Sequence, residues 1–129
     1  MFDLIILAQD GKMQPLEITS ITLPTSDGQR TILSRHMEAY VEVDIGIVEI
    51  KIEKSKERYA VGGGLFHFKD NQAALMVSSF EREDEVDFER ARKAYERAKN
   101  ELQNKEDRHE MLKAEQALKR ALARLNLEK

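Results

Sequence analysis

Residues 80–91 read FEREDEVDFERA, and the chain changes character within them. All six glycines and both prolines precede this stretch, together with nearly all of the β-branched residues. No glycine or proline follows it, and about half of the later residues are charged. Glycine and proline punctuate strands and turns, whereas their absence from a charged segment favours helix. The sequence therefore predicts two units, a β domain over residues 1–82 and a helical unit over residues 83–129.

The first unit has the pattern of short strands separated by turns. Residues 46–53 alternate apolar and charged side chains, as a strand with one buried and one solvated face does. Asp10-Gly11 and Asp27-Gly28 are typical of hairpin turns. Further strands are expected at residues 4–7, 18–23, 59–61, 65–68 and 73–77. So many closely spaced strands predict a β-sandwich.

Two helices are expected in the second unit. Asp84 is the predicted N-cap of the first, because the acidic residues 83–87 suit the positive end of a helix dipole. Asn104-Lys105-Glu106 interrupts the pattern, and Asp107 with Glu110 predicts a capping box that opens the second helix. The expected buried stripes are Val86, Ala91, Ala94, Tyr95, Ala98 and Leu102 in the first helix, and Met111, Ala114, Leu118, Ala121, Leu122 and Leu125 in the second.

Helices joined by so short a break are expected to fold back on each other. The predicted fold class is thus α+β, an N-terminal antiparallel β-sandwich followed by a C-terminal antiparallel α-helical hairpin. Because the stripes are rich in alanine, their buried area is small. We therefore expect the hairpin to be able to detach from the sandwich.

Composition excludes several functional classes. The 129 residues carry a formal net charge of −3, whereas a nucleic-acid-binding domain normally has a basic surplus, so no nucleic-acid partner is expected. There is no cysteine, which removes disulfides and thiolate metal sites. No apolar run approaches the roughly 20 residues that cross a bilayer. We expect any membrane association to be indirect, through other proteins.

Catalytic and metal-binding motifs are also missing from the sequence. The triplet Gly62-Gly63-Gly64 lacks the Lys-Ser/Thr that ends a phosphate-binding Walker loop, and its place between strands favours a bulge or a close backbone approach. His36, His67 and His109 do not have metal-ligand spacing. We expect no catalytic residue, no metal site and no catalytic cofactor.

Three segments resemble the epsilon subunits of F-type ATP synthases. Asp27-Gly28 followed by TILSRH at residues 31–36 is similar to the family's glycine-isoleucine-leucine-proline-glycine-histidine loop. YAVGGGLF at residues 59–66 resembles its tyrosine-x-valine-x-glycine-glycine-phenylalanine segment, and the alanine- and arginine-rich helices end with ALKRALARL at residues 117–125. Each segment alone is a weak motif, but the order and spacing of the three together are specific to this family. The departures are Ser34-Arg35 in place of proline-glycine and Gly62 in place of a common serine.

The resemblance implies a non-catalytic subunit of a rotary motor. The sandwich would bind the gamma subunit and the ring of c subunits (the c-ring). The hairpin would move between a compact form and an extended form that reaches the alpha and beta subunits and inhibits ATP hydrolysis. The resemblance also implies a peripheral position on the cytoplasmic face of the bacterial plasma membrane.

In some bacterial members of this family the compact hairpin binds ATP through isoleucine or leucine followed by Asp-x-x-Arg-Ala. VDFERA at residues 86–91 matches this pattern, with valine first. The resemblance thus implies that ATP, with or without magnesium, is a regulatory ligand. Carried over by position, its site consists of Glu81, Val86, Asp87, Arg90, Ala91, Arg97, Arg120 and Arg124. The carboxylates among them would accept hydrogen bonds from the adenine amino group or the ribose hydroxyls.

Helix geometry brings the arginines together without help from the resemblance. If the hairpin folds at its short break, Arg90 lies next to Arg120, and Asp87 lies opposite Arg124. Arg97 lies two turns further toward the bend on much the same face as Arg90. This cluster suits a polyphosphate, because guanidinium binds phosphate oxygens in a bidentate fork. The alternative is a set of solvated arginines in surface ion pairs worth less than about 1 kcal/mol each.

Two other functions are weighed against the motor subunit. A structural adaptor of the same architecture, unrelated to ATP synthase, would need a strict heptad pattern to self-associate, whereas these stripes are short and alanine-rich. An ATP-hydrolysing enzyme would need catalytic groups that the sequence does not offer. Co-purification with gamma, alpha and beta subunits distinguishes the motor subunit from the adaptor.

Overall fold

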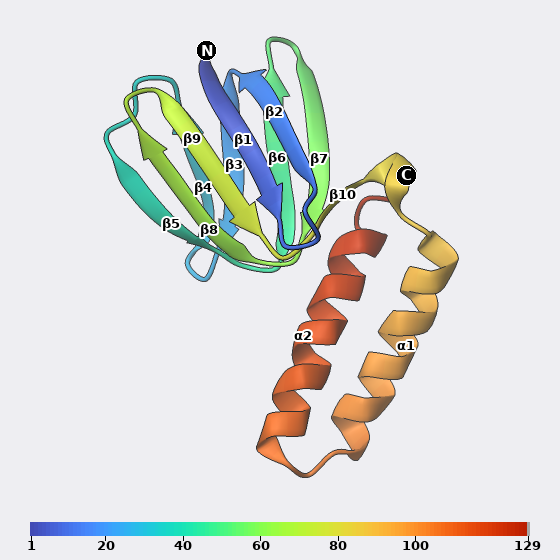
Figure 1. Cartoon of the computed structure of the whole chain (residues 1–129). Coiled ribbons are helices and arrows are strands. Elements are labelled where there is room, and N and C mark those ends of the chain that lie inside the picture. Colours follow the sequence, from blue (N-terminus) through green and yellow to red (C-terminus); the bar gives the residue numbers. More distant parts are fainter. Residues whose placement is uncertain (129) are drawn as a thin grey trace.

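The computed structural model describes residues 1–128, in which a β-sandwich continues into a helical hairpin (Figure 1). Within that range the strands are β1 (Phe2–Ala8), β2 (Met13–Ile18), β3 (Ser20–Thr25), β4 (Gly28–Leu33), β5 (Ala39–Val43), β6 (Gly46–Ile52), β7 (Ser55–Val61), β8 (Gly64–Lys69), β9 (Gln72–Val77) and β10 (Phe80–Arg82). A 3-10 turn at Glu83–Glu85 leads to α1 (Phe88–Asn104) and α2 (Arg108–Leu125). Lys129, the last residue of the predicted helical unit, lies outside the described residues.

The strands form two five-stranded sheets. Sheet A has the order β2-β1-β9-β8-β5, and sheet B has the order β10-β7-β6-β3-β4. With the two antiparallel helices that follow, the sheets confirm the predicted sandwich and hairpin (Figure 1). The expectation of a wholly antiparallel sandwich is wrong at one pair, because β1 and β9 run parallel. These strands are far apart in the chain, so no tight turn fixes their relative direction.

The core lies between the two sheets and takes alternate residues from each strand. Phe2, Leu4 and Ile6 of β1 are buried, and so are Val48 and Ile50 of β6. The residues between them lie on the outer faces of the sheets, because successive side chains of a strand point to opposite sides. The alternation seen in the sequence of β6 is therefore confirmed.

Four strands, β2, β4, β5 and β10, were not expected from the sequence. β2 contains Pro15, which argues against a central strand, but β2 lies at the edge of sheet A, where a missing N–H is tolerated. The single strand expected at residues 18–23 is divided at Thr19 between β2 and β3. β10 is only three residues long and is defined by its pairing with β7, which a local pattern cannot indicate.

Two unusual backbone segments have clear physical causes. The glycine triplet joins β7 to β8; Gly63 has a φ of 93°, and a side chain at Gly64 would clash with the carbonyl oxygen of Met76. The triplet is thus a close backbone approach, as expected. In the β4–β5 loop, Arg35 has a φ of 65°, in the left-handed region that favours glycine. The side-chain oxygen of Asn71 supports this conformation by accepting a hydrogen bond from the N–H of Arg35 at 2.8 Å.

The start of α1 differs from the prediction. Its N-cap is Asp87, whose carboxylate accepts a hydrogen bond from the N–H of Arg90 at 3.1 Å. The prediction of Asp84 is wrong, because Asp84 lies in the 3-10 turn that precedes the helix. The predicted N-cap of α2 is confirmed, since Asp107 accepts a hydrogen bond from the N–H of His109 at 2.9 Å.

The buried faces of the helices are narrower than expected and consist mainly of alanine. Met111 and Leu122 were expected in the buried stripe but are 37% and 45% exposed. Small alanine side chains bring the helices together over a thin strip, so larger side chains at its margins face solvent. The buried alanines are Ala91, Ala98, Ala114, Ala121 and Ala123.

The hairpin packs on sheet B through a small apolar cluster that is separate from the sandwich core. The cluster consists of Ala60, Val86, Ala123 and Leu127, with Ile47 and Phe88 packed against it. Only four of the described residues are buried in it, and two of them are alanines, so the contact buries little apolar area and contributes correspondingly little to stability. The hairpin therefore depends on polar contacts with the sandwich as well.

We expect a chain that ends at Arg82 to fold, and a chain that ends at Ser79 to be far less stable. Phe80 is 2% exposed and belongs to the sandwich core, where the loss of a large aromatic side chain costs about 3 kcal/mol or more. Thermal unfolding followed by circular dichroism compares the two truncations. Equal melting temperatures would show that the β domain ends before Phe80 rather than at the predicted boundary after residue 82.

Candidate functional site

A cavity of about 510 Å³ lies where the hairpin meets the sandwich. Its walls come from β10, the 3-10 turn, α1 and the last turns of α2. The lining residues are Glu81, Glu85, Asp87, Arg90, Ala91, Lys93, Ala94, Arg97 and Arg124. The cavity thus brings together most of the residues that the resemblance assigns to a nucleotide site, from three separate elements.

Two of the predicted site residues lie beside this cavity and do not line it. Val86 is buried in the apolar cluster under the hairpin, where it supports the start of α1. Arg120 lines a narrow adjoining gap, together with Glu81 and Arg124, which line both spaces. Arg120 is therefore a neighbour of the cavity, one turn of α2 away from Arg124.

The cavity also contains residues that the sequence analysis did not select, Glu85, Lys93 and Ala94. Lys93 lies three residues after Arg90 and four before Arg97, and residues at these spacings share one helix face. That spacing is a signal by which Lys93 could have been found. Glu85 reaches the cavity through the 3-10 turn, which the sequence analysis did not predict.

Each carboxylate of the cavity already accepts a hydrogen bond from the protein. Glu81 Oε1 lies 2.7 Å from Arg124 Nε, and the two side chains are 25% and 31% exposed. The sequence places Arg124 opposite Asp87, and both residues line the cavity, but the ion-pair partner of Arg124 is Glu81. Asp87 caps α1, and Glu85 Oε2 accepts a hydrogen bond from Lys12 Nζ at 2.8 Å.

The three cationic side chains that α1 contributes to the cavity are different, because they have no such partner. Arg90, Lys93 and Arg97 form no side-chain ion pair or hydrogen bond with any residue between 1 and 128. By comparison, Arg92 on the same helix forms two 2.8 Å hydrogen bonds to Glu128. The cavity therefore contains three uncompensated positive charges along one face of α1.

Lys12 fastens the 3-10 turn to the sandwich. Besides Glu85, its ammonium donates to the carbonyl oxygen of Phe80 at 3.2 Å and lies 5.0 Å from the centre of the Phe80 ring. The hydrogen bond from Lys12, together with one from the N–H of Arg82, lowers the pKa of the Glu85 carboxyl. Lys12 thus ties the residues up to Glu85 to the β domain, and the helical hairpin begins just after them.

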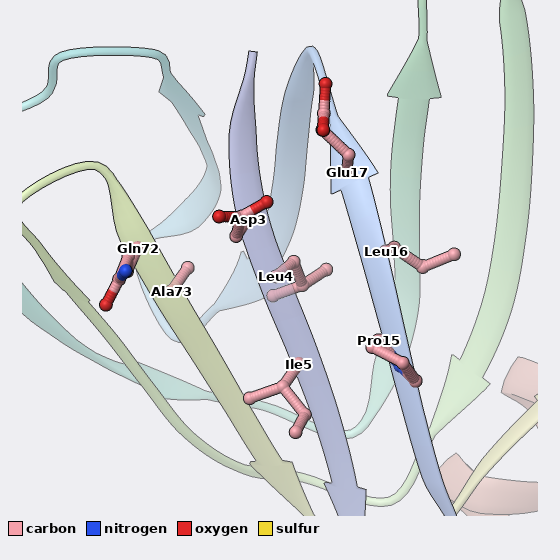
Figure 2. Close-up of a pocket in the computed structure, with 8 residues that line it drawn as sticks. All are labelled: Asp3, Leu4, Ile5, Pro15, Leu16, Glu17, Gln72 and Ala73. Carbon is pink, nitrogen blue, oxygen red and sulfur yellow. The ribbon is translucent and has the colours of Figure 1, made fainter.

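A second cavity, of about 460 Å³, lies on the outer face of sheet A (Figure 2). Figure 2 shows Asp3 and Ile5 on β1 beside Pro15 and Glu17 on the neighbouring strand β2. None of its lining residues comes from the helices or from the predicted nucleotide site. It belongs to a different surface of the molecule.

Other kinds of site find no support in the part of the chain that the structure covers. Among residues 1–128, no three His, Cys, Asp or Glu side chains are placed to hold a metal ion. Neither helix described in this range is long and apolar enough to span a membrane.

Comparison with known proteins identifies the family. The description "ATP synthase, Delta/Epsilon chain, beta-sandwich domain" matches residues 1–83, and "ATP synthase, Delta/Epsilon chain, long alpha-helix domain" matches residues 84–127. The chain belongs to the ATP synthase delta/epsilon family. As a member of this family it is a non-catalytic epsilon subunit of the ATP synthase central stalk.

Individual relatives agree with this assignment over most of their length. The ATP synthase epsilon chain of Lactobacillus gasseri is 33% identical, over 95% of this chain and 88% of its own. That of Trichodesmium erythraeum is 34% identical, over 93% of this chain and 90% of its own. A chain in the cryo-EM structure of the Euglena gracilis mitochondrial ATP synthase (OSCP/F1/c-ring) superposes with a TM-score of 0.75 at 27% identity, over 90% of this epsilon subunit and 74% of that chain.

The contact between Lys12 and Glu85 should give this epsilon subunit a pH-dependent stability. The folded-state pKa of Glu85 lies below its ordinary value of 4.5, so the stabilisation is complete above that pH and is lost as the pH falls through the lower, folded-state pKa. Glu85→Gln should therefore lower the urea midpoint at pH 7, with a progressively smaller effect below pH 4.5. Glu106→Gln, at an exposed residue of the bend, is the matched control. An effect of Glu85→Gln that stays constant with pH would show that the ion pair does not stabilise the fold.

Proposed function

We propose that this chain is the ATP-sensing epsilon subunit of a bacterial ATP synthase, and that ATP binds in the 510 Å³ cavity. The observation that carries the proposal is the set of three α1 cations, Arg90, Lys93 and Arg97, that line one cavity without ion-pair partners among residues 1–128. Like charges held together repel each other, and an anion that enters relieves this repulsion. A nucleoside triphosphate supplies several negative charges in a row, which can extend along this face of α1.

The polarity of the cavity suggests how the nucleotide lies. Glu81 and Asp87 lie at the sandwich end, where their oxygens can accept hydrogen bonds from the adenine amino group or the ribose hydroxyls. Arg90 and Arg97 can bind phosphate oxygens in bidentate fashion. Magnesium can accompany ATP without a protein cluster of its own, because it is often held by substrate phosphates and water.

Binding in this cavity would favour the compact hairpin. Glu81 belongs to β10, Arg90 to α1 and Arg124 to α2, so a ligand that contacts all three joins elements that separate when the hairpin opens. A ligand that binds one state only shifts the equilibrium by about 2.7 kcal/mol at a hundredfold excess over its dissociation constant. The small apolar contact under the hairpin makes such a shift decisive.

The regulatory consequence follows from this coupling. High ATP keeps the hairpin compact and away from the alpha and beta subunits. When ATP falls, the hairpin extends, reaches these subunits and inhibits hydrolysis. The site senses ATP and does not hydrolyse it, since each cavity carboxylate is already engaged by Arg124, Lys12 or the N-terminus of α1.

The sandwich has an uncovered face that suits the gamma subunit. On the outer side of sheet A, Met13, Tyr40, Leu65 and Met76 are 63%, 66%, 40% and 39% exposed. They lie on four of the five strands of sheet A, β2, β5, β8 and β9. An exposed apolar band across a sheet is typical of a protein-binding surface. The hairpin covers part of sheet B instead, through Ala60. We assign this band, together with the cavity of Figure 2, to gamma.

We assign the end of the sandwich farthest from the hairpin to the c-ring. Met1, Leu33 and Met37 are exposed there, and Asn71 ties the loop that carries Arg35 to the N-terminus. In Figure 1 the N-terminus lies at the end of the sandwich away from the helices. Through gamma and the c-ring, the subunit is held peripherally at the cytoplasmic face of the bacterial plasma membrane.

The isolated protein should bind one ATP, prefer it to ADP, and release no phosphate. Arg90→Ala combined with Arg124→Ala removes two charge-assisted contacts, so we expect ATP affinity to fall at least about thirtyfold. In the reconstituted complex this variant should inhibit hydrolysis even at high ATP. Calorimetry and a hydrolysis assay at several ATP concentrations measure both effects, and Arg108→Ala at the start of α2 is the control.

Failure of the wild-type protein to bind millimolar ATP would show that this subunit is not an ATP sensor. Unchanged ATP dependence of hydrolysis with the double variant would show that the arginines are only solvated surface residues. Phosphate release by the pure protein would favour an enzyme.

The gamma assignment predicts that a charge in the apolar band weakens assembly. Met76→Glu places a carboxylate among Tyr40, Leu65 and their neighbours, and we expect at least about a tenfold loss of affinity for gamma, as for a central interface residue. Thr31→Glu adds the same charge to an exposed residue on the outer face of sheet B and is the control. Surface plasmon resonance with immobilised gamma compares the two variants. A stronger effect of Thr31→Glu would move the interface to sheet B.

A further inference from the structure

The charges of the 510 Å³ cavity are segregated along α1. The acidic residues lie at the sandwich end: Glu81 on β10, Glu85 in the 3-10 turn and Asp87 at the N-cap. The cationic residues continue from there toward the bend of the hairpin. With a rise of about 1.5 Å per residue, the backbone of Lys93 lies about 4.5 Å beyond that of Arg90, and that of Arg97 about 10 Å beyond it. The cavity therefore has an acidic end near the sandwich (the near end) and a cationic end toward the bend of the hairpin (the far end).

The two ends differ in how much positive charge is available to a ligand. At the near end, Arg124 is neutralised by Glu81 at 2.7 Å. At the far end, Lys93 and Arg97 have no ion-pair partner in the described residues, and the acidic lining residues are all at the opposite end. A chain of phosphates that starts at Arg90 thus meets its greatest uncompensated charge one to two helix turns further on.

We propose that Lys93 distinguishes a triphosphate from a diphosphate, its ammonium binding the terminal phosphate of the nucleotide. This inference rests on the proposed ATP site. The third phosphate extends the ligand beyond a diphosphate held by Arg90, toward Lys93, whose backbone lies about 4.5 Å further along α1. Lys93 therefore adds binding energy for ATP and little for ADP, which makes it a specificity-determining residue.

The test measures dissociation constants of the full-length protein for ATP and ADP by calorimetry. Lys93→Gln removes the charge at nearly constant length, and we expect ATP to bind about tenfold more weakly, as for the loss of one charge-assisted contact, while ADP changes less than about threefold. Lys93→Arg keeps the charge and should keep the preference for ATP. Lys99→Gln, on the same helix but outside the cavity, should behave as wild type.

A second pair of ligands measures the contribution of the phosphates to binding without that of the nucleoside. Tripolyphosphate and pyrophosphate carry the same difference in length without a nucleoside, so Lys93→Gln should reduce the preference for tripolyphosphate as well. Helix content by circular dichroism confirms that the variants fold, since Lys93 is exposed. The salt dependence of ATP binding should also become shallower in Lys93→Gln, because one ionic contact is lost.

Three results would overturn the inference. Equal weakening of ATP and ADP by Lys93→Gln would make Lys93 a general source of positive charge, and no weakening at all would place it outside the site. In either case a loss of ATP binding in Arg90→Ala would leave the proposed function intact. If the wild-type protein binds neither nucleotide, the proposed function and the role of Lys93 fail together.

Discussion

The ion pair between Arg124 and Glu81 is the contact on which the arrangement of the two units depends. It joins the last turn of α2 to β10, at a distance of 2.7 Å and with both side chains largely withdrawn from solvent. The apolar cluster beneath it is small, and among the described residues the other polar link between the end of α2 and the sandwich is a longer hydrogen bond of 3.4 Å, from Arg58 to the carbonyl oxygen of Asn126. The guanidinium of Arg124 also lines the cavity in which we propose that ATP binds. Closure of the hairpin and recognition of the ligand therefore draw on one side chain.

Much of the fold could be predicted from the sequence because its signals are local. The alternation in β6, the turn at Asp10-Gly11 and the N-cap at Asp107 depend on neighbouring residues only. The parallel pairing of β1 with β9 was missed because it joins strands about seventy residues apart, and β10 because three residues carry no periodicity. The N-cap at Asp87 was missed because several acids compete for that role, and the 3-10 turn decides among them.

The candidate site shows the same division between local and distant information. Arg90, Ala91 and Arg97 line one cavity because helix periodicity alone puts them on one face. The partner of Arg124 depends instead on how the hairpin sits on sheet B, which no helix pattern contains. Lys93 was overlooked for a different reason, since a family pattern carried over by position selects only the positions that it names. Physical proximity recovers such residues where a motif does not.

The contacts of Lys12 with Glu85 and with the carbonyl oxygen of Phe80 have a mechanical consequence. Because the chain is fastened up to Glu85, only Val86 and Asp87 separate the fixed part from the first residue of α1. The 17 residues of α1 form a rod about 26 Å long, and the opening that we propose would swing this rod about the pivot as a rigid lever. A lever with a fixed fulcrum sweeps a defined arc, whereas a long flexible tether would explore a volume. In the proposed extended form, the tip of the hairpin would therefore be confined to that arc.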